Sequence, residues 1–431
     1  MKGTAFVKLL ILLLPLLNPF CSLAQTGGDT AKIVPNGTDG LDLNKRPKDS
    51  LIKTLLPNEF EGQFSTFRIG FGYIGDFTTY KTNDVFNRQM DTAGIVLTPQ
   101  FQTRDARILG SGVLTTKRSI SWKFAYMYDG NQKYWLVRET GITVGLPEIK
   151  SHIFIGRTKE GYSMVKVMNG HSPWGYERMM ALDVIPIMAD GVKVFGFDDR
   201  SKIFWNLGYF NDIVSKGQGF STFAWQGVAR IGWVPVNDPK KGKTLHIAGN
   251  FRYGKPLDGK MTLKSRPESN NTPFLISTGS FAADYSTHLG GEIFYSAHRF
   301  VIGSEIAIHS FYKTGGTNHT FYGGNVMLAY SITGGKRPYK TAGNIFGFMP
   351  VRKSILQKGT GEIELAIFLS TLNLNDQSIA GGQMWRLTPM INWYPLKYMR
   401  VEFIYGYGIL DRYNLQGAIQ FFESRIQFTI M

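Results

Sequence analysis

From Phe64 to Met431 the chain repeats segments of roughly ten residues in which apolar side chains alternate with polar or small ones. In residues 361–370 the odd-numbered positions from Ile363 to Leu369 are aliphatic, and the even-numbered positions include Glu362 and Glu364. Successive side chains of a β-strand point to opposite faces, so each segment predicts a strand with one continuous apolar face. Charged residues on the second face indicate a wall with lipid outside and water inside.

The same alternation continues to the end of the chain. In residues 399–408 and 425–430 an apolar face opposes Arg400, Glu402 and Arg425. Turn clusters such as Asp129–Asn131 separate the segments at hairpin spacing. A soluble β-sandwich would also alternate, but it would not usually present apolar side chains outward along strand after strand.

Lipid offers no hydrogen-bond partners, so a sheet that crosses a membrane cannot keep open edges. About 370 residues, at roughly 22–24 per strand with its turn, give about 16 strands, a size that leaves an aqueous lumen. We therefore predict an all-β fold, a transmembrane antiparallel β-barrel of about 16 strands formed by residues 61–431. Tyrosines and tryptophans near strand ends predict interfacial girdles, the candidates being Trp122, Tyr126, Tyr128, Tyr134, Trp135, Trp393, Tyr394 and Tyr398.

The N-terminal region predicts export. Lys2 and Lys8 flank the start of a short apolar run, and Ser22–Ala24 forms a small-residue cleavage pattern, so residues 1–24 read as a signal peptide. A lipoprotein with Cys21 at its start is the alternative, but no small residue precedes Cys21. Residues 25–60 are polar and without periodicity, which indicates a flexible periplasmic segment. We expect the protein in the outer membrane of a Gram-negative type of cell, in contact with its lipid.

The chain is strongly basic. Its formal net charge of +16 falls to +14 once Lys2 and Lys8 are removed with the signal peptide. A basic exported protein attracts anions, and nucleic acid is not an expected partner in that compartment. Removal of the signal peptide also removes Cys21, which leaves no cysteine for a disulfide, a metal site or a nucleophile.

Several segments resemble the phosphate-selective porin O and P family, in the same order along the chain. The segments that carry the resemblance are Arg104–Gly110, Ser121–Tyr126, Leu136–Glu139, Ile155–Met164, Glu177–Met179, Gly361–Ala366, Gly381–Gly382, Ile391–Tyr394, Arg400 and Ser424–Phe428. The resemblance implies a 16-stranded barrel, trimeric in many members, that passes anions such as phosphate through a lumen lined by Arg and Lys. It also makes residues 166–200, which lack alternation, an inward-folded constriction loop; an ordinary surface loop is the alternative.

The chain departs from the family pattern at two places. Ile367–Leu369 stands where members often carry Arg, and Gly156–Thr158 stands where Gly-Gln-Phe is commoner. We therefore expect a preference for small anions in general, with phosphate and other oxyanions among the candidates. The side chains predicted to line the anion pathway are Arg104, Arg107, Arg138, Arg157, Lys159, Lys166, Arg178, Arg400 and Arg425. For each of them a solvated rim charge, or a partner of an inward Glu, is the alternative.

The alternative to a channel is a barrel without a transport role, namely an outer-membrane hydrolase or an adhesin or scaffold. The sequence contains no Gly-x-Ser-x-Gly, His-Glu-x-x-His or P-loop motif. Catalytic residues that assemble across strands would escape such a search. We expect a protein that is not an enzyme and that holds no cofactor or metal. Conduction by the folded barrel distinguishes a channel from these alternatives.

Overall fold

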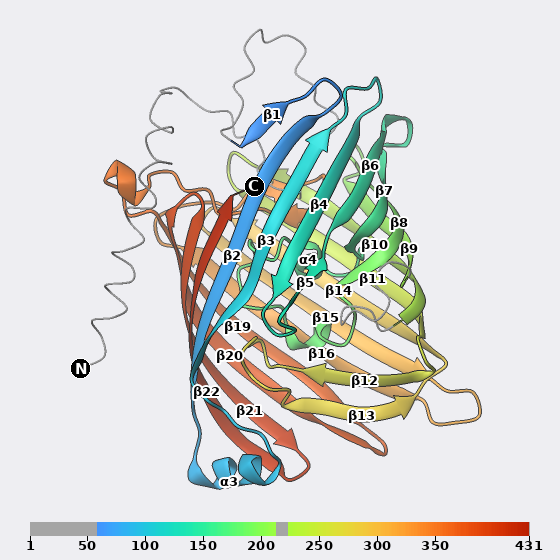
Figure 1. The fold of residues 1–431 in the computed structure, drawn as a ribbon, viewed down its shortest axis with the longest axis vertical. Helices are drawn as coiled ribbons and strands as arrows, with labels where there is room; N and C mark the ends of the chain where they lie inside the picture. The colour runs from blue at the N-terminus through green and yellow to red at the C-terminus, as the bar shows by residue number, and fades with distance from the viewer. Residues whose placement is uncertain (1–57, 213–222, 431) are drawn as a thin grey trace.

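The computed structural model describes residues 58–212 and 223–430, in which 16 antiparallel strands form a closed barrel (Figure 1). This confirms the predicted fold and strand number. The wall strands are, in order, β2 (Thr66–Lys81), β3 (Gln100–Val113), β4 (Ile120–Asp129), β6 (Thr140–Leu146), β7 (Ser151–Lys159), β8 (Met188–Asp198), β9 (Ile203–Asn211), β10 (Phe223–Asp238), β11 (Lys243–Pro256), β14 (Tyr285–Ala297), β15 (Phe300–Tyr312), β16 (His319–Ser331), β19 (Glu362–Asp376), β20 (Ile379–Leu396), β21 (Met399–Arg412) and β22 (Leu415–Ile430).

The first and last wall strands close the barrel. β2 pairs with β22 from Phe71↔Ile430 to Lys81↔Gln420, and with β3 on its other side. A short strand, β1 (Glu59–Glu61), adds to the start of β2. β5 (Tyr134–Val137) pairs with one half of β4 and β6 pairs with the other half, so the two act as a single wall strand.

Side chains alternate across the wall as the sequence predicts. Along β19, Leu365 and Leu369 are exposed on the outer surface, whereas Glu364 and Ser370 are buried inside. In β21 and β22 the inward positions hold Arg400 and Arg425, each of them only 2% exposed. The apolar outer surface and the charged interior therefore arise from one two-residue period.

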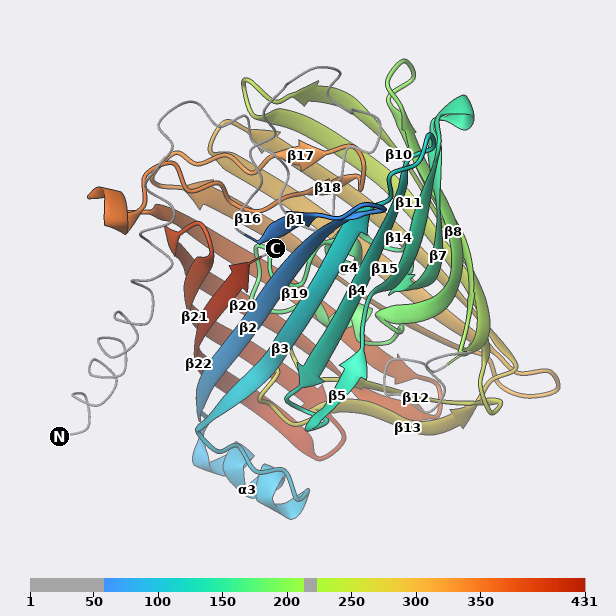
Figure 2. The same ribbon diagram turned by 45° about the horizontal axis from the view of Figure 1, so that its top comes forward.

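The chain enters β2 and leaves β22 at one end of the barrel, which we call the terminal end; the opposite end is the loop end. Connections at the terminal end are short except for residues 332–361, which contain β17 (Tyr339–Lys340), β18 (Ile345–Phe346) and η4 (Ile355–Gln357). At the loop end, α3 (Asp84–Thr92) packs beside β22, and β12 (Lys260–Ser265) pairs with β13 (Ile276–Ala282) (Figure 2).

The expected loop at residues 166–200 has the wrong boundaries. Residues 160–187 connect two wall strands, but Met188–Asp198 form β8, which pairs with β7 and β9. Gly191 is required in the wall: a Cβ atom there would lie 2.1 Å from the carbonyl oxygen of Tyr209. Close backbone approach of this kind is a common reason for glycine within a strand.

The aromatic girdle is present in part. Tyr126 and Trp135 are both exposed on the outer surface, with ring centroids 5.2 Å apart. Tyr394, in contrast, is buried, and its hydroxyl lies 3.2 Å from a carboxylate oxygen of Glu364 inside the barrel. The prediction that Tyr394 belongs to a girdle is wrong because proximity to a strand end does not determine the face on which a side chain lies.

Some expectations fall on residues that the structure does not describe. The signal peptide (residues 1–24) and the greater part of the predicted periplasmic segment (25–60) lie outside the described residues. Among the residues that are described, none of the helices has the length and apolar character needed to cross a membrane.

We predict that Ile367→Arg lowers the free energy of unfolding by about 2–4 kcal/mol, the usual effect of Arg on the lipid face near the middle of a membrane strand. Ile367 lies near the middle of β19 and is 40% exposed on the outer surface. Urea titration of protein refolded into lipid vesicles measures the change. The control is Tyr413→Arg, at a hairpin tip where the side chain is 78% exposed. Equal destabilisation by both variants would contradict a lipid-facing β19.

Candidate functional site in the barrel lumen

The connection between β7 and β8, residues 160–187, enters the barrel and binds one wall through its first turn. Backbone N–H groups of Ser163, Met164 and Val165 donate to Asn250 Oδ1 (3.0 Å), Glu292 Oε2 (3.0 Å) and Glu305 Oε1 (2.9 Å). These acceptors lie on β11, β14 and β15. Two carboxylates thus hold the N-terminus of α4 (Met164–Val167), where free N–H groups favour negative charge.

The same segment then reaches the opposite wall. His171 Nε2 lies 3.2 Å from Asp105 Oδ1 on β3, and Arg400 of β21 donates to the carbonyl oxygen of Trp174 (3.1 Å). Glu177 accepts from Arg104 Nη2 (2.7 Å) and from Arg425 Nη2 (2.6 Å). Because β3, β21 and β22 lie across the ring from β11, β14 and β15, residues 160–187 cross the lumen.

Two further segments contribute to the interior. From the terminal end, Arg337 donates to the carbonyl oxygen of Ser172 (2.7 Å), and Phe346 packs against the ring of Trp174 at a centroid distance of 5.1 Å. From the loop end, Thr272 lies within hydrogen-bond distance (3.1 Å) of the Tyr80 hydroxyl. Chain segments from both ends therefore contribute to the interior, and residues 160–187 lie between them.

Most of the cations predicted to line the anion pathway lie inside the barrel beside carboxylates. The ion pairs are Arg104 with Asp105 (2.6 Å) and Glu177, Arg107 with Asp105 (2.7 Å), Arg157 with Asp190 (3.0 Å), Lys166 with Glu160 (2.7 Å), Arg400 with Glu402, and Arg425 with Asp76 (2.7 Å) and Glu177 (2.6 Å). A buried charge is costly unless it is paired. Most of these pairs join residues of the wall to one another, and the pairs of Glu177 with Arg104 and Arg425 join the wall to residues 160–187, which we call the inner segment.

The surroundings of Arg178 and Arg138 differ from those of the six paired cations described above. Among the described residues, no carboxylate forms an ion pair with Arg178, which is half-buried in the inner segment. Burial and the nearby charge of Arg104 lower the pKa of Arg178 to about 10, so it is still charged at neutral pH. Arg138 lies in the break between β5 and β6 and contacts Met127 Sδ (3.4 Å).

Lys159, the remaining predicted residue, belongs to a cluster of three lysines. Lys123, Lys159 and Lys193 line a cavity of about 110 Å³ that contains one carboxylate, Glu139. The cavity lies inside β4, β6, β7, β8 and β9, between the inner segment and residues 342–345. Its walls also carry His152. Three ammonium groups around one carboxylate make this part of the lumen net positive.

Contacts within the cavity hold the lysines in place. Lys123 Nζ lies 3.3 Å from Glu139 Oε2 and 5.0 Å from the ring centroid of Phe154. Lys193 Nζ donates to Thr158 Oγ1 (3.1 Å) and to the carbonyl oxygen of Lys159 (3.2 Å), and lies 5.5 Å from the Phe154 centroid. Contacts with the face of an aromatic ring are favourable for ammonium groups.

The sequence interpretation missed Lys123 and Lys193. Lys123 lies between Trp122 and Phe124, so the two-residue period of β4 places its side chain on the opposite face from theirs, inside the barrel. Lys193 lies between Val192 and Val194 in β8, which had been assigned to a loop. For Lys123 the signal was the same alternation that identified the barrel, whereas the segment that contains Lys193 was read as lacking it.

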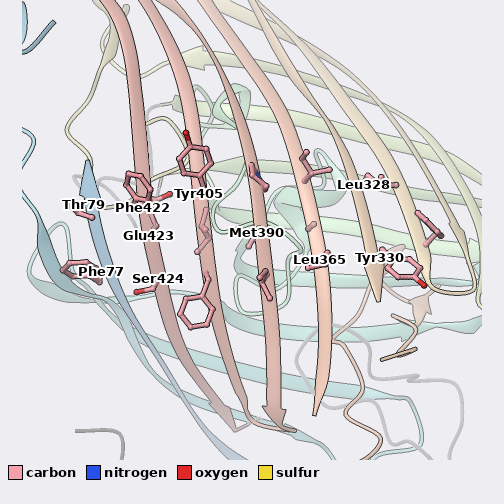
Figure 3. Close-up of a pocket in the computed structure, with 17 residues that line it drawn as sticks. Phe77, Thr79, Leu328, Tyr330, Leu365, Met390, Tyr405, Phe422, Glu423 and Ser424 are labelled. Carbon is pink, nitrogen blue, oxygen red and sulfur yellow. The ribbon is translucent and has the colours of Figure 1, made fainter. Parts of the chain in front are cut away.

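A separate groove of about 940 Å³ lies on the outer surface, over β15, β16, β19–β22 and β2. Figure 3 shows its lining, in which Phe77, Leu328, Leu365 and Tyr405 are labelled. The lining is almost entirely apolar, so the groove suits lipid or another apolar surface and offers no route for ions.

As regards metals, no group of three or more His, Cys, Asp or Glu suited to a metal ion occurs among the described residues.

Comparison with known proteins identifies both family and fold. The model of the family described as phosphate-selective porin O and P matches residues 67–428. An uncharacterized protein of Caulobacter vibrioides is 30% identical over 189 residues, which cover 42% of this chain and 37% of that protein's own length.

Two solved porin structures share the fold. Salmonella typhi OmpF in complex with daunomycin has a TM-score of 0.57 at 12% identity and covers 86% of this chain and 100% of its own. An anion-selective porin from Comamonas acidovorans has a TM-score of 0.52 at 12% identity and covers 85% and 100%. At such low identity these two structures support the fold alone.

Glu268, between β12 and β13, allows a test of the packing inside the loop end. It is 9% exposed, and burial raises its pKa to about 7, although the charge of Arg386 opposes the rise. A carboxyl whose pKa is raised on folding stabilises the protein below its unfolded pKa, and that contribution is lost as the pH rises through the folded value.

We therefore predict that the free energy of unfolding falls by up to about 3 kcal/mol between pH 4 and pH 7 through this group, and that Glu268→Gln removes this part of the pH dependence. Urea titrations at several pH values, followed by tryptophan fluorescence, measure the effect. Asp258→Asn, at an exposed position of the same segment, is the control. An unchanged pH profile in Glu268→Gln would show that Glu268 is solvated in the lumen.

Proposed function

The chain belongs to the phosphate-selective porin O and P family and is therefore an outer-membrane porin, and from this premise we propose that it conducts small anions past a cluster of lumen lysines. The observation that carries the proposal is the cavity shared by Lys123, Lys159 and Lys193. Rings and clusters of cationic side chains lower the electrostatic barrier for anions and raise it for cations. The net positive charge of the chain as a whole supports the same direction of selectivity.

The chemistry of the lumen favours anions in general over one particular oxyanion. Guanidinium groups bind oxyanions through two parallel hydrogen bonds. Arg425 already makes two such bonds to Asp76, and Nη1 of Arg157 donates to both carboxylate oxygens of Asp190. Lysines act as point charges and discriminate less between anions. Phosphate and other oxyanions are accordingly proposed as substrates alongside chloride.

Residues 160–187 are proposed as the constriction of this pathway, because they cross the lumen between the two walls. Their anchoring by Glu292, Glu305, Arg400 and Arg425 would keep the opening fixed in size, so that only small solutes pass. We further propose that residues 1–24 act as a signal peptide, that residues 25–60 extend into the periplasm, and that copies of the chain assemble as a homotrimer.

We predict that Lys123→Gln, Lys159→Gln and Lys193→Gln together lower the ratio of anion to cation permeability by about tenfold, the factor that corresponds to a loss of about 1.4 kcal/mol in the barrier difference. Reversal potentials of single channels in a planar bilayer under a KCl gradient measure the ratio, and added phosphate tests for block. The control replaces Lys133, Lys255 and Lys260, which are exposed at the loop end, with Gln.

The control triple variant removes the same charge and is expected to change the ratio little. Equal ratios in the lysine-cluster variant and in the native protein would exclude the cluster from the pathway. A well-folded native barrel that conducts no current would exclude the channel function and favour a scaffold or a hydrolase.

A further inference from the structure

Exposed basic residues are concentrated at one end of the barrel. Every connection at the terminal end carries Lys or Arg, and the exposed ones include Lys117, Lys150, Arg200, Lys241, Arg299 and Lys397. Charges at the loop end are more evenly balanced. Residues 82–99 hold two acidic residues and one basic, residues 257–284 hold three of each, residues 130–139 hold one acidic and two basic, and residues 313–318 hold one basic. The terminal end is therefore a ring with an excess of positive charge around the wall, in which Arg118 and Lys150 pair with Glu148 and Asp198.

One part of this ring projects from it. Residues 351–361, which we call the rim knob, extend sideways beyond the barrel wall near the ends of β19–β22, as the orange helical turn in Figures 1 and 2 shows. Ile355 and Leu356 of η4 are 39% and 57% exposed. Lys353 and Lys358 flank them, and both are exposed. The rim knob therefore exposes two aliphatic side chains that lie between two exposed cations.

The rim knob is an ordered structure. Ser354 and Gln357 form a capping box, and the N–H groups of Gly359 and Gly361 donate to the carbonyl oxygens of Ser354 (2.9 Å) and Lys353 (3.1 Å). The indole N–H of Trp393 donates to the carbonyl oxygen of Thr360 (2.9 Å). Trp393 alternates with the inward-facing Asn392, so its ring lies on the lipid side of β20. The knob is therefore attached to the outer wall at an interfacial aromatic residue.

We propose that the rim knob and the adjoining basic turns bind the headgroups of anionic phospholipids in the membrane leaflet at the terminal end. Ile355 and Leu356 would enter the boundary between headgroups and acyl chains, while Lys353, Lys358 and Lys397 contact lipid phosphates. Aliphatic residues flanked by cations bind anionic membrane surfaces in this way. The proposal depends on the barrel lying in a membrane and is independent of anion conduction.

A second copy of the chain is a less suitable occupant. Copies inserted in one membrane share their orientation, so a second copy seated on the rim knob would bring its own basic turns against Lys353 and Lys358; the homotrimer proposed above would therefore use another part of the wall. Like charges at an interface are unfavourable. An anionic lipid supplies the opposite sign at the required depth, and its acyl chains continue the apolar surface of the wall.

The test uses the full-length protein in nanodiscs of phosphatidylcholine, with or without phosphatidylglycerol. We expect phosphatidylglycerol to slow amide hydrogen exchange in residues 351–361. We also expect phosphatidylglycerol to be retained over phosphatidylcholine in native mass spectrometry.

The variant that combines Lys353→Gln, Lys358→Gln and Leu356→Ser should reduce the preference for phosphatidylglycerol by about tenfold. None of these residues lines the lumen cavity, so conductance, which confirms folding, should be unchanged.

The matched control makes the same changes at the loop end, with Lys133→Gln, Lys260→Gln and Leu257→Ser at exposed positions. It should retain the native lipid preference. Equal exchange in both lipid compositions, or full retention of phosphatidylglycerol by the rim-knob variant, would overturn the proposal. Slow exchange of residues 351–361 in phosphatidylcholine alone, seen only in samples that contain oligomers, would assign the surface to a second copy of the chain. That result would also overturn the proposal.

Discussion

Backbone hydrogen bonding without water is the constraint on which this structure depends. Hydrocarbon offers no donor or acceptor, so each peptide group of the wall must be paired with a neighbouring strand. The pairing of β2 with β22 meets that requirement by leaving the wall no open edge. Closure also divides side chains into two populations, one facing lipid and one enclosed, and every later feature follows from which population a residue joins.

Enclosure creates a second problem, because charged side chains that alternate inward must be solvated or paired there. The structure solves it mainly by pairing. Arg425 joins Asp76 on the wall to Glu177 on the inner segment, and Glu292 joins Arg230 to the N-terminus of α4. These contacts use up most of the positive charge of the lumen. In the proposed anion pathway, selectivity would depend on a place where cations outnumber carboxylates, such as the cavity of Lys123, Lys159 and Lys193.

Part of the site could be predicted from the sequence, because some of its features depend only on residues that are close together along the chain. Inward positions such as Arg400 and Arg425 follow from the parity of one strand, which is local. Tyr394 and β8 were misassigned because an aromatic residue near a strand end, or a glycine such as Gly191, has the same local appearance in a wall and in a loop. The partners of the inward arginines depend on residues up to 349 positions apart, as for Arg425 and Asp76, and no local pattern carries that information.

The sequence by itself determined the closed barrel, its strand number and the basic character of the chain, because each depends on a repeated local period, on chain length or on composition. It also determined the family, through the ordered segments that resemble its members. Only the tertiary structure decided where the positive charge is effective. Folding brought carboxylates to most of the lumen arginines and left three lysines around one glutamate, and it gathered the exposed cations of separate turns at one end of the barrel. Electrostatic fields depend on distances in space, and those distances are set when the barrel closes and the inner segment crosses it.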